Sequence, residues 1–445
     1  MRAASRSLRL ALLALAMLVT FGFLRSAPRS AEACAFLRTP QAYEADRARS
    51  TYSAAMDLAA VDGLFPADPS FGLPAMKIGT RAQRTDGPRR IAAPLLRSIG
   101  WVESNLSMAA RSVPFQSTGA ALVSFDCGHG IMQVTTGMTV PLGTNNQPTP
   151  AQVNTATHFA YNVAKGAVIL AEKWNQAPDF RPIAGTDTQG TPAIIENWYF
   201  AVWAYNGFTG PGSTQSNHPL DPVFANPREG WRCDGTQSRT RYPYQELVWG
   251  CLNSPPVSNG TRLWAPLALS LPNTTLPHYF QPLSVQNWVF PYSAMDMPTP
   301  QPAHVDPPQN IAPDARARLL GAPVPAVSSP PIEIRAGVSA AAARASVEVR
   351  NAGSGILVWA ATPSANWIVV DPPAGVSLGP DVACTAPCNP TSTLTVTVNP
   401  VLLPNSFASG RVVITGVNAA GAPVSVPVTV NADFELGASG TSRAY

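Results

Sequence analysis

The chain has 445 residues, of which 45% are hydrophobic and 13% are charged, so it can form two or three domains with well-filled cores. Its formal net charge of +4 is too weak and too dispersed to indicate a nucleic-acid-binding protein, although it suits an anionic polymer. The 46 prolines predict long extended loops and linkers.

The N-terminus has the pattern of an export signal. Three arginines precede an uncharged apolar run over 10–24, and the small-residue site Ala31-Glu32-Ala33 follows. We therefore expect a signal peptide over 1–33 and a secreted or cell-envelope protein. An uncleaved N-terminal anchor and a lipoprotein attached through Cys34 remain alternatives. No later segment is long and apolar enough to cross a membrane, so we expect no membrane span in the mature chain.

Six cysteines are typical of an oxidising compartment, and we expect them to form disulfides. The short spacing of Cys384 and Cys388 suits a small closed loop, and Cys233 and Cys251 flank one surface-like stretch. By elimination Cys34 would pair with Cys127, although six cysteines allow 15 pairings. A metal site at Cys384 and Cys388 is disfavoured because no further thiol or histidine lies close by in sequence. We expect no metal.

Between the signal and residue 297 the pattern is mostly helical. Apolar residues at helical spacing predict four helices and the start of a fifth, and proline-rich turns separate them. Pro94 is placed near the first turn of the second helix, where proline is tolerated. The expected helices cover 42–61, 94–103, 154–174 and 192–205, with a further start at 242–248.

The remaining third of the chain changes character. Nine prolines between 298 and 330 predict a semi-rigid, extended linker. Beyond it, apolar residues alternate with polar ones over 347–350, 394–398, 412–415 and 424–430, as in β-strands. We expect about seven short strands in a β-sandwich over 331–435, followed by a flexible tail over 436–445.

Three short motifs in the helical region carry chemistry. They are Ile99-Gly100-Trp101-Val102-Glu103-Ser104, Gly128-His129-Gly130-Ile131-Met132-Gln133-Val134 and Ala204-Tyr205-Asn206-Gly207. In this order they resemble the signature of the soluble lytic transglycosylases, over roughly residues 90–255. The C-terminal strands, with Trp367, resemble BACON-like, immunoglobulin-type modules.

The resemblance and the sequence pattern together predict a multidomain protein. A helical extension (34–90) precedes a mainly α, lysozyme-like domain (91–297) that is related to goose-type lysozyme. The linker (298–330) and an all-β, immunoglobulin-like sandwich follow. The family cleaves the β-1,4 bond between N-acetylmuramic acid and N-acetylglucosamine in peptidoglycan and forms a 1,6-anhydro ring. We therefore expect a monomeric enzyme that acts on peptidoglycan glycan strands without a cofactor.

The family's mechanism uses one glutamate, which the resemblance assigns to Glu103, as acid and then as base. A carboxylic acid donates a proton near neutral pH only if its pKa is raised, and burial among apolar groups raises it. Glu103 follows an apolar helix, so this role is physically reasonable.

The same resemblance implies substrate-binding roles for the other motif residues. Glycines allow the chain to approach a sugar closely, and the Gln133 amide can both donate and accept hydrogen bonds from an N-acetyl group. The tyrosine of the third motif is expected to hold Glu103 and tune its pKa. The substrate-binding candidates are Ser104, Gly130, Met132, Gln133, Tyr205 and Asn206.

Two other functions stay open at this point. The first is a muramidase on the same fold, for which Asp126 is the best candidate for a second carboxylate. The second is a non-catalytic wall-binding surface protein. The segment Val113–Phe125 departs from the family pattern as an insertion that alters the cleft. The β-module either binds carbohydrate or serves as a spacer, because Trp359 and Trp367 could both be core residues.

Overall fold

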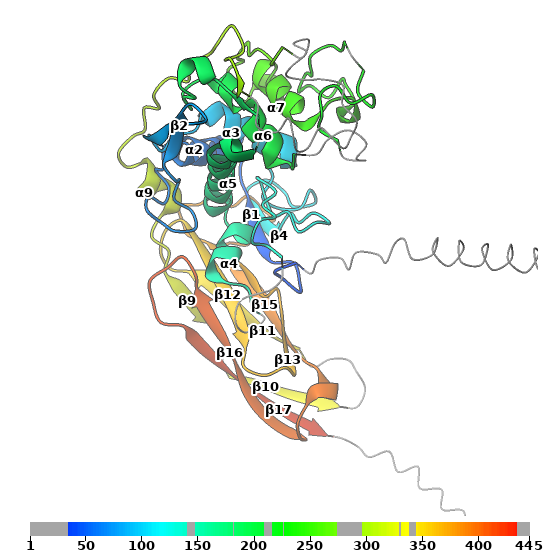
Figure 1. The fold of residues 1–445 in the computed structure, drawn as a ribbon. Helices are drawn as coiled ribbons and strands as arrows, with labels where there is room; N and C mark the ends of the chain where they lie inside the picture. Colours follow the sequence, from blue (N-terminus) through cyan, green and yellow to red (C-terminus); the bar gives the residue numbers. More distant parts are fainter. Residues whose placement is uncertain are drawn as a thin grey trace, which may run out of the picture.

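The computed structural model describes residues 34–139, 147–180, 182–208, 216–225, 227–273, 296–328, 331–337 and 344–433. The predicted signal peptide (1–33) and the tail (436–445) lie outside the described residues. Figure 1 shows a helical part and an elongated β-sandwich joined end to end. The chain therefore combines helical and β architecture in separate parts, as expected.

The helical part is built around one long helix, α5, against which shorter helices pack. Helices α3 and α7 pack against each other, as do α5 and α6. Its helices are α2 (Ser50–Ala59), α3 (Ala93–Ser104), α4 (Pro150–Thr157), α5 (Phe159–Phe180), α6 (Tyr199–Tyr205) and α7 (Tyr244–Asn253). Short strand pairs join them: β1 (Gln41–Glu44) with β4 (Ser117–Ala120), β2 (Met76–Gly79) with β3 (Arg84–Gly87), and β6 (Val257–Ser258) with β7 (Thr261–Arg262).

Helix α3 forms as the sequence predicts. Pro94 lies in its first turn, and the buried residues Leu95, Ile99 and Val102 recur at spacings of three and four. The helix ends at Asn105, which has a left-handed conformation with φ 58° and donates from its N–H to the carbonyl of Trp101 at 2.8 Å. This ending fixes the position of the last helical turn, which contains Glu103.

The single helix predicted over 42–61 is wrong. Residues 41–44 form strand β1, which pairs with β4; the buried Glu44 carboxylate also accepts hydrogen bonds from the N–H groups of Met108 and Ala109 at 2.9 and 3.0 Å and pairs with Arg49. The helix begins later, at Ser50, whose N–H donates to the side chain of Asp46 at 3.0 Å. Long-range polar contacts of a buried carboxylate thus override the local helical pattern.

The helices predicted over 154–174 and 192–205 are each divided. Helix α4 ends before His158, whose extended backbone (φ −121°, ψ 122°) separates it from α5. Residues 195–198 form a 3₁₀ turn that leads into α6. Helix α7 starts at Tyr244, inside the stretch predicted to begin a helix.

All three expected disulfides are present. Cys34 pairs with Cys127, Cys233 with Cys251, and Cys384 with Cys388. Three disulfides suit an oxidising, extracytoplasmic environment. Across the described ranges, no helix is long and apolar enough to cross a membrane.

The C-terminal part is a sandwich of two sheets. One has the strand order β10-β17-β16-β12-β14 and the other β13-β15-β11-β9. Its strands are β9 (Pro325–Ser328), β10 (Ile332–Gly337), β11 (Arg344–Asn351), β12 (Ile356–Pro363), β13 (Ile368–Asp371), β14 (Ala374–Leu378), β15 (Ser392–Val398), β16 (Phe407–Gly416) and β17 (Val424–Asp433). Trp359 and Trp367 are both buried between the sheets, so neither offers a surface to sugar.

Strand β12 is buried on both faces. Leu357 and Trp359 point into the sandwich core, whereas Ile356 and Val358 join the core of the helical part. Further contacts cross the junction, including a hydrogen bond of 2.7 Å from the Tyr43 hydroxyl to the Ala383 carbonyl. The sandwich is therefore packed directly onto the helical part.

The segment 298–330, predicted as an extended linker, contains regular structure in its described part (298–328) and contacts other elements. It contains helix α9 (Ala315–Leu320), which lies on α2, and strand β9 of the sandwich. Arg316 Nε donates to the Leu64 carbonyl at 2.6 Å, and Arg90 pairs with the buried Asp306 at 2.9 Å. Long-range polar contacts therefore anchor parts of this segment to the helical part, which local composition cannot show.

Candidate functional site

Glu103 lies in the last turn of α3 and faces the start of α7. The phenol of Tyr244, the first residue of α7, donates a hydrogen bond to Oε1 of Glu103 at 2.5 Å. The two helices are held together nearby by Ser98, whose hydroxyl donates to the Val248 carbonyl at 2.8 Å. The carboxyl group is therefore fixed between two packed helices.

The surroundings raise the pKa of Glu103 to about 7. Burial is the main cause, because it favours the neutral acid; the hydrogen bond from Tyr244 acts in the opposite direction. The Glu103 side chain nevertheless keeps some solvent exposure. A carboxyl group with this pKa can be protonated at neutral pH and can also release its proton.

Two charged side chains act on Glu103 from a distance. The cation of Arg239 lowers its pKa, and the carboxylate of Asp126 raises it. Arg239 is held beside the helix end, because its Nη2 donates to the Val102 carbonyl at 2.6 Å. Asp126 is exposed and accepts a hydrogen bond from the Ser124 hydroxyl at 2.5 Å. Asp126 therefore lies within electrostatic reach of Glu103 but is not hydrogen-bonded to it.

The glycine-rich turn packs beside the end of α3 and requires Gly130. Gly130 has φ +64°, and a Cβ there would lie 2.7 Å from both Asn162 Nδ2 and Met108 Sδ. Asn162 holds the turn, donating to the His129 carbonyl at 2.7 Å and accepting from the Met132 N–H at 2.9 Å. The buried turn thus supports the end of α3, which carries Glu103.

Three of the predicted substrate-binding side chains make contacts within the protein. Met132 is fully buried in the core, so its side chain cannot contact a ligand, because the long helix α5 covers it. The Ser104 hydroxyl lies 2.8 Å from the Ile131 carbonyl and 3.0 Å from the Gly100 carbonyl, and so joins α3 to the turn. Gln133 Nε2 donates back to the Gly130 carbonyl at 2.8 Å. Its amide is half-buried and retains its oxygen.

The third motif also reaches this region. The Tyr205 hydroxyl donates to the Met132 carbonyl at 2.8 Å. Burial raises the pKa of Tyr205 well above its ordinary value, and the nearby Glu103 raises it further. Tyr205 is thus a neighbour of Glu103, but the hydrogen bond expected from it is made by Tyr244. Asn206 is exposed and accepts a hydrogen bond from Asn217 Nδ2 at 3.0 Å.

Tyr244 and Arg239 are site residues that the sequence does not predict. Tyr244 is 141 residues from Glu103 and was noted only as part of a helix start. The sequence gives no local signal for either contact, because both depend on how α7 and its preceding loop fold against α3.

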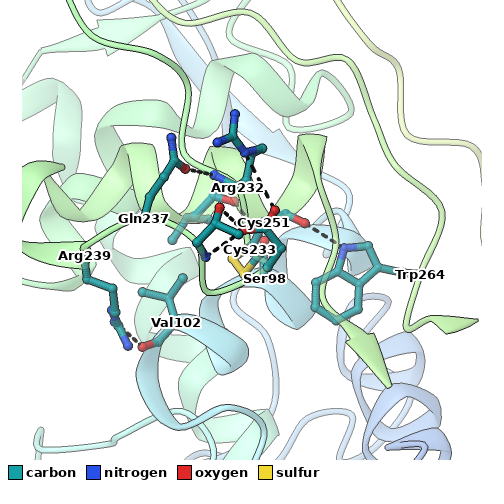
Figure 2. Close-up of a disulfide and its surroundings, with 11 residues drawn as sticks. Ser98, Val102, Arg232, Cys233, Gln237, Arg239, Cys251 and Trp264 are labelled. Carbon is teal, nitrogen blue, oxygen red and sulfur yellow. Dashed lines mark hydrogen bonds and ion pairs between the residues drawn. A yellow bond between two sulfur atoms is a disulfide. The ribbon is translucent and has the colours of Figure 1, made fainter. Parts of the chain in front are cut away.

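A groove of about 410 Å³ opens on the side of α3 that bears Trp101 and Asn105. The loop closed by the disulfide Cys233–Cys251 also lines the groove. Arg239 is a further lining residue, and Figure 2 shows it beside Val102. The loop is braced internally, because Gln237 Oε1 accepts a hydrogen bond from the Arg232 N–H at 2.6 Å. The groove therefore has a fixed wall beside the helix that carries Glu103.

Histidine, cysteine and carboxylate side chains do not gather into a group of three or more that could hold a metal ion, as far as the described residues show. The buried His129 and His158 have lowered pKa values because of burial, and that of His158 is about 3. Both are neutral residues of the packed interior.

No family model matches the chain, and no curated protein matches it. Solved structures give slight similarities. A Bacteroides ovatus GH5 xyloglucanase in complex with a XXXG heptasaccharide matches with a TM-score of 0.17 and 14% identity, over 24% of this chain and 19% of that chain. The chaperone–adhesin complex CsuC-CsuE of Acinetobacter baumannii gives 0.18 and 13%, over 25% and 57%.

The PapD-like domain 7 of human CEP192 gives a TM-score of 0.20 and 9% identity, over 29% of this chain and 96% of that chain. The chain thus spans about a fifth of the xyloglucanase and little more than half of the bacterial complex chain that it matches. These similarities carry no argument about the function of the site.

Proposed function

We propose that this protein is a peptidoglycan lytic transglycosylase with a lysozyme-like catalytic domain and that Glu103 is its general acid and base. The observation that supports this most strongly is the environment of Glu103: a carboxyl group with a pKa of about 7, fixed by Tyr244 at the end of an apolar helix. The sequence motifs around Glu103, Gly130 and Tyr205 also support it, because they occur in the order of that family.

In this proposal the protonated Glu103 donates its proton to the glycosidic oxygen as the bond to the sugar breaks. The leaving sugar departs with that proton, and the resulting carboxylate stabilises the cationic sugar. Glu103 then takes the proton from the C6 hydroxyl of the same sugar, whose oxygen closes the 1,6-anhydro ring. Tyr244 keeps the carboxyl group oriented through both steps.

A muramidase is the second candidate, and Asp126 is the observation that favours it. Its carboxylate acts on Glu103 through space and raises the pKa of Glu103. In a hydrolase Asp126 would position a water molecule, and the product would have a reducing end. A wall-binding protein without activity is the third possibility, for which the raised pKa of Glu103 would have no purpose.

The deciding experiment is digestion of purified peptidoglycan by the chain and by its Glu103→Gln variant, followed by mass analysis of the muropeptides. Anhydro products, lighter by one water than reducing-end products and absent with the variant, would support the transglycosylase. Reducing-end products that depend on Glu103 would identify a hydrolase. Absence of products from both forms would leave binding as the function.

A further inference from the structure

The groove beside Trp101 contains a positively charged side chain, Arg239, that has no direct part in the proposed reaction. Arg239 lines it and has its only hydrogen bond among the described residues to a backbone carbonyl, that of Val102. No ion pair to Arg239 occurs in the described part of the chain, whereas Arg49, Arg97 and Arg228 each pair with a carboxylate. Arg239 is thus a cation without a directly bound counter-charge.

The other charged residue of the groove does not neutralise Arg239. Asp234 is exposed, pairs with Arg232 at 3.7 Å and accepts hydrogen bonds from the N–H and hydroxyl of Thr236 at 2.9 and 2.6 Å. The remaining lining that faces solvent is apolar or amide, including Trp101, Asn105 and Val257. The groove therefore combines an aromatic surface, an amide and an unpaired guanidinium.

We propose that this groove binds a carboxylate-bearing unit of the glycan substrate and that Arg239 pairs with the carboxylate. A guanidinium binds carboxylates by charge-assisted hydrogen bonds, often in pairs. Trp101 offers a face to the apolar side of a sugar ring, and Asn105 can bond to an acetamido group. The inference rests on the proposed function, because it assigns the groove to the same polymer that Glu103 cleaves.

The position of the groove supports this assignment. Val102, next to Glu103 in the chain, lines the groove and accepts a hydrogen bond from Arg239, and the charge of Arg239 acts on Glu103, so the groove lies close to that carboxyl group. The disulfide Cys233–Cys251 ties the loop that lines the groove to α7, the helix that begins with Tyr244. The same helix therefore carries the partner of Glu103 and one side of the groove.

The test measures binding by titration calorimetry in the Glu103→Gln background, which prevents cleavage and removes the effect of Arg239 on the Glu103 pKa. Three ligands are compared: chitohexaose, which has no carboxylate; peptide-free glycan strands, whose muramic acid carries a free lactyl carboxylate; and strands that retain their peptides. Arg239→Gln should weaken binding of a carboxylate-bearing strand about tenfold and that of chitohexaose less than about twofold. The glycan ligand whose binding is weakened identifies whether the sugar or its peptide supplies the carboxylate.

Two further variants keep the test independent of folding. Arg241→Gln removes an exposed cation of the same 3₁₀ turn that does not line the groove, and should leave all three affinities unchanged. Val257→Glu places a negative charge on an exposed position of the groove, and should weaken carboxylate-bearing strands alone. Equal losses for chitohexaose, or no loss with Arg239→Gln, would overturn the inference. Because the assay measures binding, a chain that cleaves no peptidoglycan would refute the proposed function but not the assignment of the groove.

Discussion

The hydroxyl of Tyr244 lies 2.5 Å from Oε1 of Glu103 and joins two helices whose residues are 141 positions apart in the chain. This hydrogen bond stabilises the charged form of Glu103, whereas burial stabilises the neutral form. The balance keeps the carboxyl group close to its point of half-protonation at neutral pH. Acid and base roles by a single group require such a balance.

Replacing Tyr244 by Phe should disturb this balance without opening a cavity. Loss of the hydrogen bond raises the pKa of Glu103, so the fall of activity on the alkaline side should move to higher pH. Because the carboxyl group also loses its orientation, we expect kcat to decrease about tenfold. The pH dependence of glycan-strand cleavage measures both effects.

Tyr205→Phe is the matched control, because the Tyr205 hydroxyl bonds to the Met132 carbonyl and not to Glu103. It should lower the free energy of unfolding by about 1 kcal/mol and leave the alkaline limb in place. If this limb moved as far in Tyr205→Phe as in Tyr244→Phe, Tyr244 would not have the specific role given to it here.

Asp126→Asn distinguishes the two candidate reactions. Removing the carboxylate lowers the pKa of Glu103, because a repulsive charge is lost, and the alkaline limb should move to lower pH. In a transglycosylase the anhydro products should persist at near-normal yield at mildly acidic pH. Loss of nearly all cleavage at every pH, measured by muropeptide analysis, would instead assign Asp126 a direct part in a hydrolase.

Glu103 should destabilise the fold as it ionises. Its pKa is about 7 in the folded chain against 4.5 for an ordinary glutamate, so the folded state binds more protons between these values and stability falls as pH rises through them. Glu103→Gln stays neutral, and its amide oxygen can still accept the bond from Tyr244. The variant should therefore gain stability over the natural chain, by up to about 3 kcal/mol above pH 7.

Urea unfolding of both forms at about pH 4 and about pH 8 measures this difference. At the lower pH Glu103 is protonated in both states, so the two free energies of unfolding should nearly coincide. A gap of the same size at both values would mean that ionisation of Glu103 is not its cause.

Gly130→Ala should destabilise the turn that supports the site. The added methyl group meets Asn162 and Met108 in a left-handed conformation, and we expect a loss of more than about 2 kcal/mol. Gly137→Ala has a similar φ of +77° but meets no described atom within 4 Å, so its loss should be about 1 kcal/mol. Thermal or urea unfolding compares the two. Equal losses would show that backbone conformation alone, without crowding by Asn162, accounts for the effect.

The sequence by itself determined the features that are local or periodic. The apolar spacing of Leu95, Ile99 and Val102 defined helix α3, and alternation defined strands such as β15, because side-chain direction repeats with the backbone. The spacing of Cys384 and Cys388 was also sufficient for their disulfide. The same local information placed Glu103 at a helix end beside apolar residues.

Only the tertiary structure decided what surrounds Glu103. The bond from Tyr244 and the cation of Arg239 come from a distant helix and loop, and the packing of Met132 and the sandwich against the helical part depends on contacts far apart in the chain. Contacts far apart in the chain likewise place Glu44 in a strand, where the sequence predicts a helix. Burial and long-range hydrogen bonds set these features, and neither is encoded in the spacing of neighbouring residues.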